Sequence, residues 1–66
     1  MVIKWRNKYS GEEGFVKTVR SNDRCFENTF NYNEARRYAS ASVAKGIITK
    51  FVSYGEAETN DFFIVE

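Results

Sequence analysis

The 66-residue sequence contains no histidine and no proline, and it has a single cysteine, Cys25. Without histidine the commonest general base is missing, and one cysteine cannot assemble a zinc site of the usual kinds. A lone cysteine also excludes an internal disulfide, which is typical of a protein in the reducing cytoplasm. No apolar run approaches the roughly 20 residues of a membrane-spanning helix. We therefore expect a cytoplasmic protein without a membrane segment or a bound metal.

The charge of the chain has no strong sign. Ten lysines and arginines stand against nine aspartates and glutamates, which leaves a net charge of +1. No overall electrostatic field therefore indicates a nucleic acid, a membrane surface or an acidic substrate as the partner. The sequence also lacks internal repeats and low-complexity tracts, so composition alone assigns no function.

What the chain does contain is aromatic side chains, which make up 17% of its residues. Each of them can bury roughly 150 to 250 Å² of surface, which is enough in sum for one small core. A chain of this length forms one domain, 1–66. Because small domains often cover surplus apolar surface by pairing with a copy, we expect a monomer or a homodimer.

Three extended segments are predicted in the first half of the chain. Val2 to Arg6 alternates apolar and charged residues with the period of a half-buried strand. Phe15 to Arg20 is rich in aromatic and β-branched residues, and the polar, glycine-containing segment from Asn7 to Gly14 predicts a hairpin between the two. A second turn at 21–23 leads to a short third strand, Cys25 to Phe30.

Helical signals occupy the next segment. Asn31 is a good N-cap, and Glu34 stands at the capping-box position three residues later. We predict a short helix at 32–38, a break near Ser40 and a longer helix at 41–53. A single unbroken helix over the same residues is the alternative.

The longer helix carries an apolar stripe with the three-and-four spacing that places side chains on one helical face. The stripe consists of Val43, Ala44, Ile47, Ile48, Phe51 and Val52. Gly55 supplies the left-handed position that commonly ends a helix. We expect the stripe to face the core, which directs the search for function to the opposite sheet face, the hairpin tip and the loop at 56–61.

The last segment, Phe62 to Val65, is continuously apolar. This predicts a strand that is buried on both faces or paired inside the sheet. The order strand, strand, strand, helix, helix, strand predicts an α+β fold. It is a small two-layer domain, in which one helical segment, or two helices, covers one face of a three- to four-stranded, mainly antiparallel sheet. If the third and last strands are parallel, their crossover is right-handed.

No group of residues forms a recognisable reaction centre. Glu12 and Glu13 are adjacent in a glycine-flanked turn, where we expect both carboxylates to stay solvated with ordinary pKa values. Cys25 has no evident neighbour that would make it a thiolate, so we expect it to pack in the core. The segment from Gly11 to Gly14 lacks the lysine and hydroxyl of a phosphate-binding loop. We predict no enzyme activity, no catalytic or metal-binding residue and no cofactor.

Nucleic-acid binding is the one function with positive support from residue chemistry. The residues are basic side chains of the first two strands: Lys4, Arg6, Lys17 and Arg20. On a sheet face left uncovered by helix they would form a phosphate-binding surface. Lysine and arginine also decorate exposed sheet faces for solubility and edge protection, and this second interpretation is the commoner one.

From Phe30 onward the chain resembles a group of small phage and prophage proteins of Gram-positive bacteria. The shared pattern is a glycine-containing hairpin, an aromatic strand, a helix start with alanine and an aromatic residue, a serine cap, an apolar helix and a terminal strand. The matching segments are Gly14-Phe15-Val16, Phe30, Glu34-Ala35-Arg36-Arg37-Tyr38, Ser40 or Ser42, Val43-Ala44 with Ile47-Ile48, and Phe63-Ile64-Val65. These are core and capping positions, so the resemblance implies no active site.

A second, looser resemblance is to the arm-binding N-terminal domain of phage-type integrases, in which a three-stranded sheet packed on one helix binds DNA. The segment Phe30-Asn31-Tyr32-Asn33-Glu34-Ala35 is similar to the sheet-to-helix junction of that domain. The present chain has no catalytic domain and adds a final strand, Phe62 to Val65. Both departures weaken the expectation of DNA binding.

These observations favour a non-enzymatic protein-interaction module of phage or prophage type, with a host or phage protein as its partner. It would bind through a sheet edge or an exposed aromatic patch. The alternative is a small DNA-binding protein that uses the basic sheet face.

Overall fold

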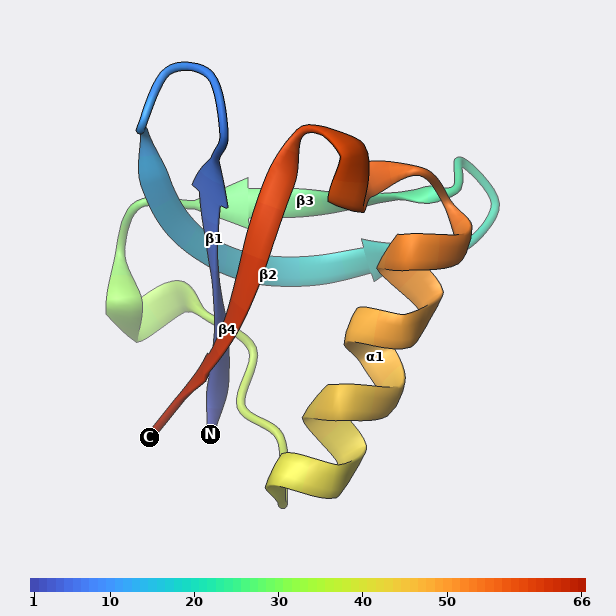
Figure 1. Ribbon diagram of the computed structural model, residues 1–66. Coiled ribbons are helices and arrows are strands. Elements are labelled where there is room, and N and C mark those ends of the chain that lie inside the picture. The colour runs from blue at the N-terminus through green and yellow to red at the C-terminus, as the bar shows by residue number, and fades with distance from the viewer.

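Four strands pair into one antiparallel sheet in the order β3-β2-β1-β4, and one helix lies against it (Figure 1). The computed structural model describes all 66 residues. Its elements are β1 (Val2–Asn7), β2 (Glu13–Arg20), β3 (Cys25–Thr29), the 3₁₀ turn η1 (Tyr32–Glu34), α1 (Ala41–Ser53), the 3₁₀ turn η2 (Glu56–Glu58) and β4 (Asn60–Val65). The predicted α+β fold is confirmed.

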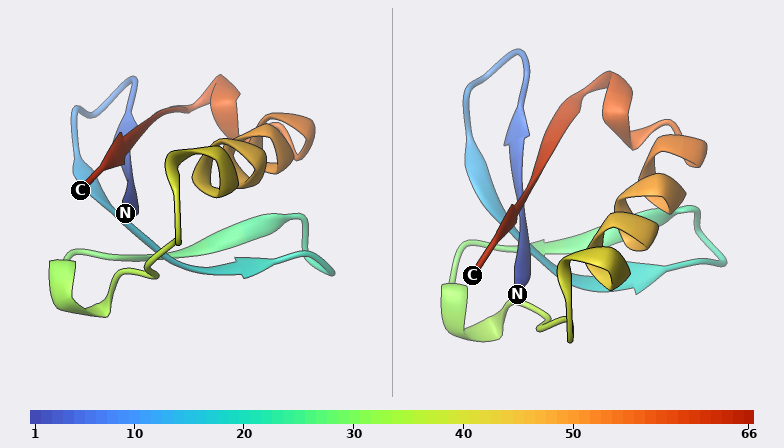
Figure 2. Two further views of the ribbon diagram at one scale, coloured as in Figure 1. Left: turned by 90° about the horizontal axis from the view of Figure 1, so that it is seen from below. Right: turned by 60° about the horizontal axis from the view of Figure 1, so that its bottom comes forward.

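The sheet is strongly twisted, so that β1 and β4 run across the direction of β2 and β3 (Figures 1 and 2). A register shift between Val16 and Thr18 marks an irregularity in the β2–β3 ladder, and such bulges increase local twist. The curvature gives the sheet a concave face, which holds α1, and a convex face on the other side. The concave face carries the apolar side chains of the core, whereas the convex face carries charged side chains that form ion pairs.

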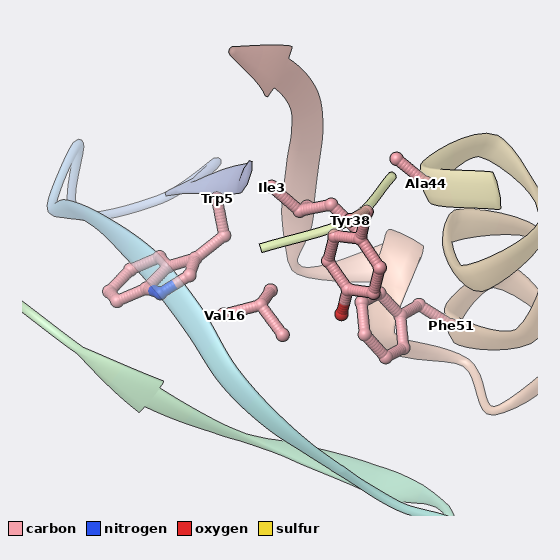
Figure 3. Close-up of a cluster of buried hydrophobic side chains, with 6 residues drawn as sticks. All are labelled: Ile3, Trp5, Val16, Tyr38, Ala44 and Phe51. Carbon is pink, nitrogen blue, oxygen red and sulfur yellow. The ribbon is translucent and has the colours of Figure 1, made fainter. Parts of the chain in front are cut away.

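The core lies on the concave face. Six buried side chains meet there from β1, β2, α1 and the β3–α1 connection, as Figure 3 shows: Ile3, Trp5, Val16, Tyr38, Ala44 and Phe51. Phe51 is fully buried, and its ring lies 5.0 Å from that of Phe26 and 5.1 Å from that of Phe62. These three rings bind α1 to the strands at both edges of the sheet.

The helix at 41–53 forms as predicted. The Ser40 hydroxyl oxygen accepts a hydrogen bond from the Val43 amide (3.3 Å), and Gly55 has the left-handed φ of 86° that ends the helical segment. The predicted stripe is wider than the buried surface, however, because its flanking residues Val43 and Val52 are 48% and 56% exposed. Only the centre of the stripe contacts the sheet.

The predicted helix at 32–38 is wrong. Only the 3₁₀ turn at Tyr32–Glu34 is helical there, and the Glu34 carboxylate accepts a hydrogen bond from the Thr29 hydroxyl instead of completing a capping box. The rest of this connection is bonded to the sheet: the Arg36 amide donates to the Val16 carbonyl (3.0 Å), and the main chain of Tyr38 exchanges hydrogen bonds with that of Met1. These long-range bonds replace the local ones that a helix needs.

The last strand is an edge strand, and the prediction that it is doubly buried or inside the sheet is wrong. β4 pairs with β1 on one side and with no strand on the other. It directs Phe62 and Ile64 toward the core, whereas Phe63 on the convex face is 39% exposed. Because β3 and β4 lie at opposite edges and are antiparallel, the crossover rule for parallel strands does not apply.

Candidate interaction surfaces

The basic residues predicted to bind nucleic acid lie on the convex face, but each has an acidic partner. Lys4 and Arg6 of β1 both contact the Glu13 carboxylate of β2, at 3.4 Å and 2.7 Å. The strand register explains the pair, because Arg6 stands directly opposite Glu13. The hydrogen bond from Arg6 and the charge of Lys4 lower the pKa of Glu13, so the prediction that its pKa is ordinary is wrong.

Lys17 and Arg20 of β2 form a second ion-pair cluster. Both contact Glu27 of β3, at 3.7 Å and 2.9 Å, and Arg20 also lies 3.7 Å from Asp23. The hydrogen bond from Arg20 lowers the pKa of Glu27. The four cations therefore form two ion-pair clusters, one around Glu13 and one around Glu27, whose carboxylates balance part of their charge.

The convex face, which the DNA-binding alternative requires to be uncovered by helix, is partly covered. Tyr32 in η1 packs edge-on against Phe15, with ring centroids 5.3 Å apart, and Arg37 lies over the Tyr32 ring at 4.9 Å. Val2 and Ala35 are buried. Val2 lies on the same face of β1 as Lys4 and Arg6, where the apolar–charged alternation of the strand would place a polar residue. Its apolar side chain was the one sequence signal that another segment covers this face.

The residues considered for catalysis were Cys25 and the adjacent pair Glu12 and Glu13. Cys25 is half-buried and free, and Glu12 is exposed in the hairpin loop. No three acidic, cysteine or histidine side chains cluster as metal ligands. The buried Tyr38 hydroxyl has no hydrogen-bond partner, and its burial raises its pKa.

The structure contains no helix with the length and apolar character that a membrane span requires.

The outer edge of β4 is an unpaired row of main-chain groups. The Lys8 amide donates to the Thr59 carbonyl (2.8 Å), which fixes the phase of the β1–β4 ladder. Hydrogen-bonded pairs alternate along an antiparallel ladder, so the odd-numbered residues of β4 bond to β1 and the even-numbered residues point away. The outward residues are Asn60, Phe62 and Ile64. No other main-chain hydrogen bond involves them.

The other edge strand, β3, is protected in ways that β4 is not. It is five residues long, it adjoins the register shift in β2, and Glu27 holds two cations on its convex side. Such short, irregular and charged edges discourage pairing with another chain. β4 instead presents Phe63, whose ring is covered by the cations of Lys4 and Arg6 at 5.7 Å and 5.3 Å.

Carboxylates flank β4 at both ends. Glu56 and Glu58 precede the strand in η2 and Glu66 follows it, and none of the three forms an ion pair, whereas Asp61 is bound by Lys8 at 3.7 Å. The edge is thus apolar in its centre and acidic at its ends. The sequence predicted a polar loop at 56–61, which includes Glu56, Glu58 and Asp61, but gave no indication that the strand after it lies at an edge.

Comparison with known proteins adds no assignment: no protein-family model, no curated protein and no solved structure matches this chain.

Proposed function

We propose that this protein is a non-enzymatic protein-interaction module, in which the free edge of β4 pairs with an extended segment of another protein. The observation that carries the proposal is the outward, unpaired main chain of Asn60, Phe62 and Ile64 in a strand with apolar side chains on both faces. Strand addition satisfies such main-chain groups and takes its specificity from alternate side chains. Phe63 would supply the contact on the convex side.

The charges around β4 favour a partner of different sequence over a second copy. In the antiparallel register that pairs all three outward residues, Phe62 stands opposite itself, and the turn η2 of one copy, with Glu56 and Glu58, adjoins the strand end of the other, with Glu66. Like charges placed opposite each other destabilise a strand pair. An apolar segment flanked by lysine or arginine complements the same edge, so a homodimer is the less favourable outcome.

The resemblance to phage and prophage proteins supports a setting for this partner. We place the protein in the bacterial cytoplasm and expect a host or phage protein as the strand donor. The immobilised protein should retain a stoichiometric partner from a Gram-positive host lysate. The variant Ile64→Pro, which lacks the outward amide, should lose that partner, while Ile64→Val should keep it.

Hydrogen exchange in the complex distinguishes strand addition from other binding modes. The amides of Phe62 and Ile64 should exchange rapidly in the free protein and at least about tenfold more slowly in the complex, while the inward amide of Phe63 is protected in both. A complex in which Phe62 and Ile64 exchange as fast as in the free protein would contradict the proposal. So would partner binding by a folded Ile64→Pro variant.

DNA binding through Lys4, Arg6, Lys17 and Arg20 is the alternative. It requires these cations to exchange their carboxylate partners for phosphates. A shift assay on duplex and single-stranded DNA at two salt concentrations tests it, because binding to phosphates must weaken as salt rises. No binding at low salt, even after Glu13→Gln and Glu27→Gln free the cations, would exclude this function.

A further inference from the structure

A groove of about 300 Å³ lies between α1 and the second half of β2, away from the free edge of β4. Its walls come from the helix, the strand and the connection that follows η1, which meet at this side of the molecule (Figure 2). The residues that matter for its chemistry are Thr18, Ser21, Arg36, Val43, Ile47 and Lys50. No acidic side chain lines it.

The two cations of the groove differ from those of the convex face because neither forms an ion pair. Arg36 is held in place by its own amide, which donates to the Val16 carbonyl, and its guanidinium lies 6.0 Å from the centre of the Tyr38 ring. Lys50 projects from α1, a helix without a single acidic residue. Both charges are therefore available to an anion from outside.

The groove also offers apolar surface and hydroxyl donors. Val43 is 48% exposed and Ile47 is partly buried, and both belong to the stripe that the sheet leaves incompletely covered. Thr18 and Ser21 supply hydroxyls on the opposite wall. An occupant that complements this surface carries a negative charge next to an apolar group.

We propose that the groove binds an acidic side chain and a neighbouring apolar side chain of a peptide segment. Arg36 and Lys50 would contact the carboxylate, while Val43 and Ile47 would contact the apolar side chain. A nucleic-acid backbone fits less well, because it requires a longer track of cations. This inference rests on the proposed role as a protein-interaction module, but it concerns a surface separate from β4.

The test uses N-acetylated, C-amidated Gly-Leu-Glu-Leu-Gly as the probe and Gly-Leu-Gln-Leu-Gly as its uncharged match. In ¹H–¹⁵N NMR titrations of the full chain, the Glu peptide should shift the amides of Thr18, Ser21, Ile47 and Lys50. The Gln peptide should bind about tenfold more weakly, because it lacks the charge that strengthens these hydrogen bonds.

Two lysines of the same helix provide a matched pair of variants. Lys50→Gln should weaken binding of the Glu peptide about tenfold, whereas Lys45→Gln, which removes the same charge from an exposed position outside the groove, should leave it unchanged. Equal binding of the Glu and Gln peptides, or equal losses in the two lysine variants, would overturn the proposal. So would an oligonucleotide that shifts the groove amides when the Glu peptide does not.

The variant Ile64→Pro separates this proposal from the previous one. Its groove should bind the Glu peptide with unchanged affinity, because β4 contributes no residue to the groove. If the groove does not bind the Glu peptide, the proposal of strand addition at β4 is unaffected. If the β4 edge does not bind a partner, the result of the peptide titration is unaffected.

Discussion

The concave and convex faces of the sheet are stabilised in two different ways. On the concave face, Ile3 and Val16 are fully buried beneath α1 and related core residues. On the convex face, Glu13 and Glu27 form ion pairs with cations of β1 and β2. The side chains of these pairs are all partly exposed to water. Burial stabilises the fold strongly and exposed ion pairs stabilise it weakly, so the two faces should respond very differently to substitution.

The largest effect is expected from Phe51→Ala on the concave face. Removing this fully buried ring leaves a cavity between α1 and the strands, which should lower the free energy of unfolding by about 3 to 5 kcal/mol. Urea unfolding followed by circular dichroism measures the change. The neighbouring Val52→Ala, at an exposed helix position, should change it by no more than about 0.5 kcal/mol. Equal losses in both variants would contradict the position of the core.

A pair of glycines tests how closely the concave face is packed. A Cβ at Gly14 would lie 2.6 Å from Trp5 Cζ2 and 3.0 Å from the Thr29 carbonyl oxygen, so Gly14→Ala should destabilise the protein by about 1 to 3 kcal/mol. A Cβ at Gly46, inside α1, meets nothing within 4 Å. Gly46→Ala should stabilise by about 1 kcal/mol through helix propensity. Thermal unfolding should show shifts of opposite sign.

The Tyr38 hydroxyl is a polar group buried in the apolar core on the concave face. It is buried without a hydrogen-bond partner, so its removal should eliminate a desolvation cost while the ring stays in place. We expect Tyr38→Phe to raise the free energy of unfolding by about 1 kcal/mol. Denaturant midpoints at constant m-value measure the gain, and a clear loss of stability would indicate a partner for this hydroxyl.

The smallest effect concerns the convex face and its response to pH. Arg6 lowers the pKa of Glu13 and Arg20 lowers that of Glu27, relative to an ordinary value of 4.5. The stability that these pairs contribute is therefore present above pH 4.5 and is lost as the pH falls through the lower values of the folded state. Melting temperatures between pH 7 and 3 should fall less steeply in the double variant Glu13→Gln, Glu27→Gln. Glu12→Gln, which removes an unpaired carboxylate, is the control and should leave the slope unchanged.

The sequence predicted the elements that depend on local signals. Ser40, the apolar spacing after it and Gly55 are close neighbours in the chain, and they define α1 as the structure has it. The segment at 32–38 carried similar signals, but its main chain is bonded to Met1 and Val16, which are far away in sequence. Helix propensity and capping signals are local, so they carry no information about hydrogen bonds between distant segments.

The interaction surfaces were harder to predict, because they depend on how strands are arranged. The four cations Lys4, Arg6, Lys17 and Arg20 lie in β1 and β2, which the sequence predicts as strands. The predicted turn includes Glu13, however, so the sequence did not indicate its ion pairs. The hairpin register, which sets Arg6 opposite Glu13, would have revealed them. The apolar character of β4 does not distinguish an edge strand from a central one, and the groove beside α1 joins three separate segments.

The pairing of Val2 with Val65 joins the two ends of the chain, which lie side by side in Figure 1. Closing so long a loop costs more chain entropy than forming either of the hairpins β1–β2 and β2–β3. We therefore expect β4 to join the sheet late in folding, after the hairpins have formed. The strand edge that we assign to partners is then the last to assemble, and in the interval before docking it is the segment most open to a chaperone or a protease.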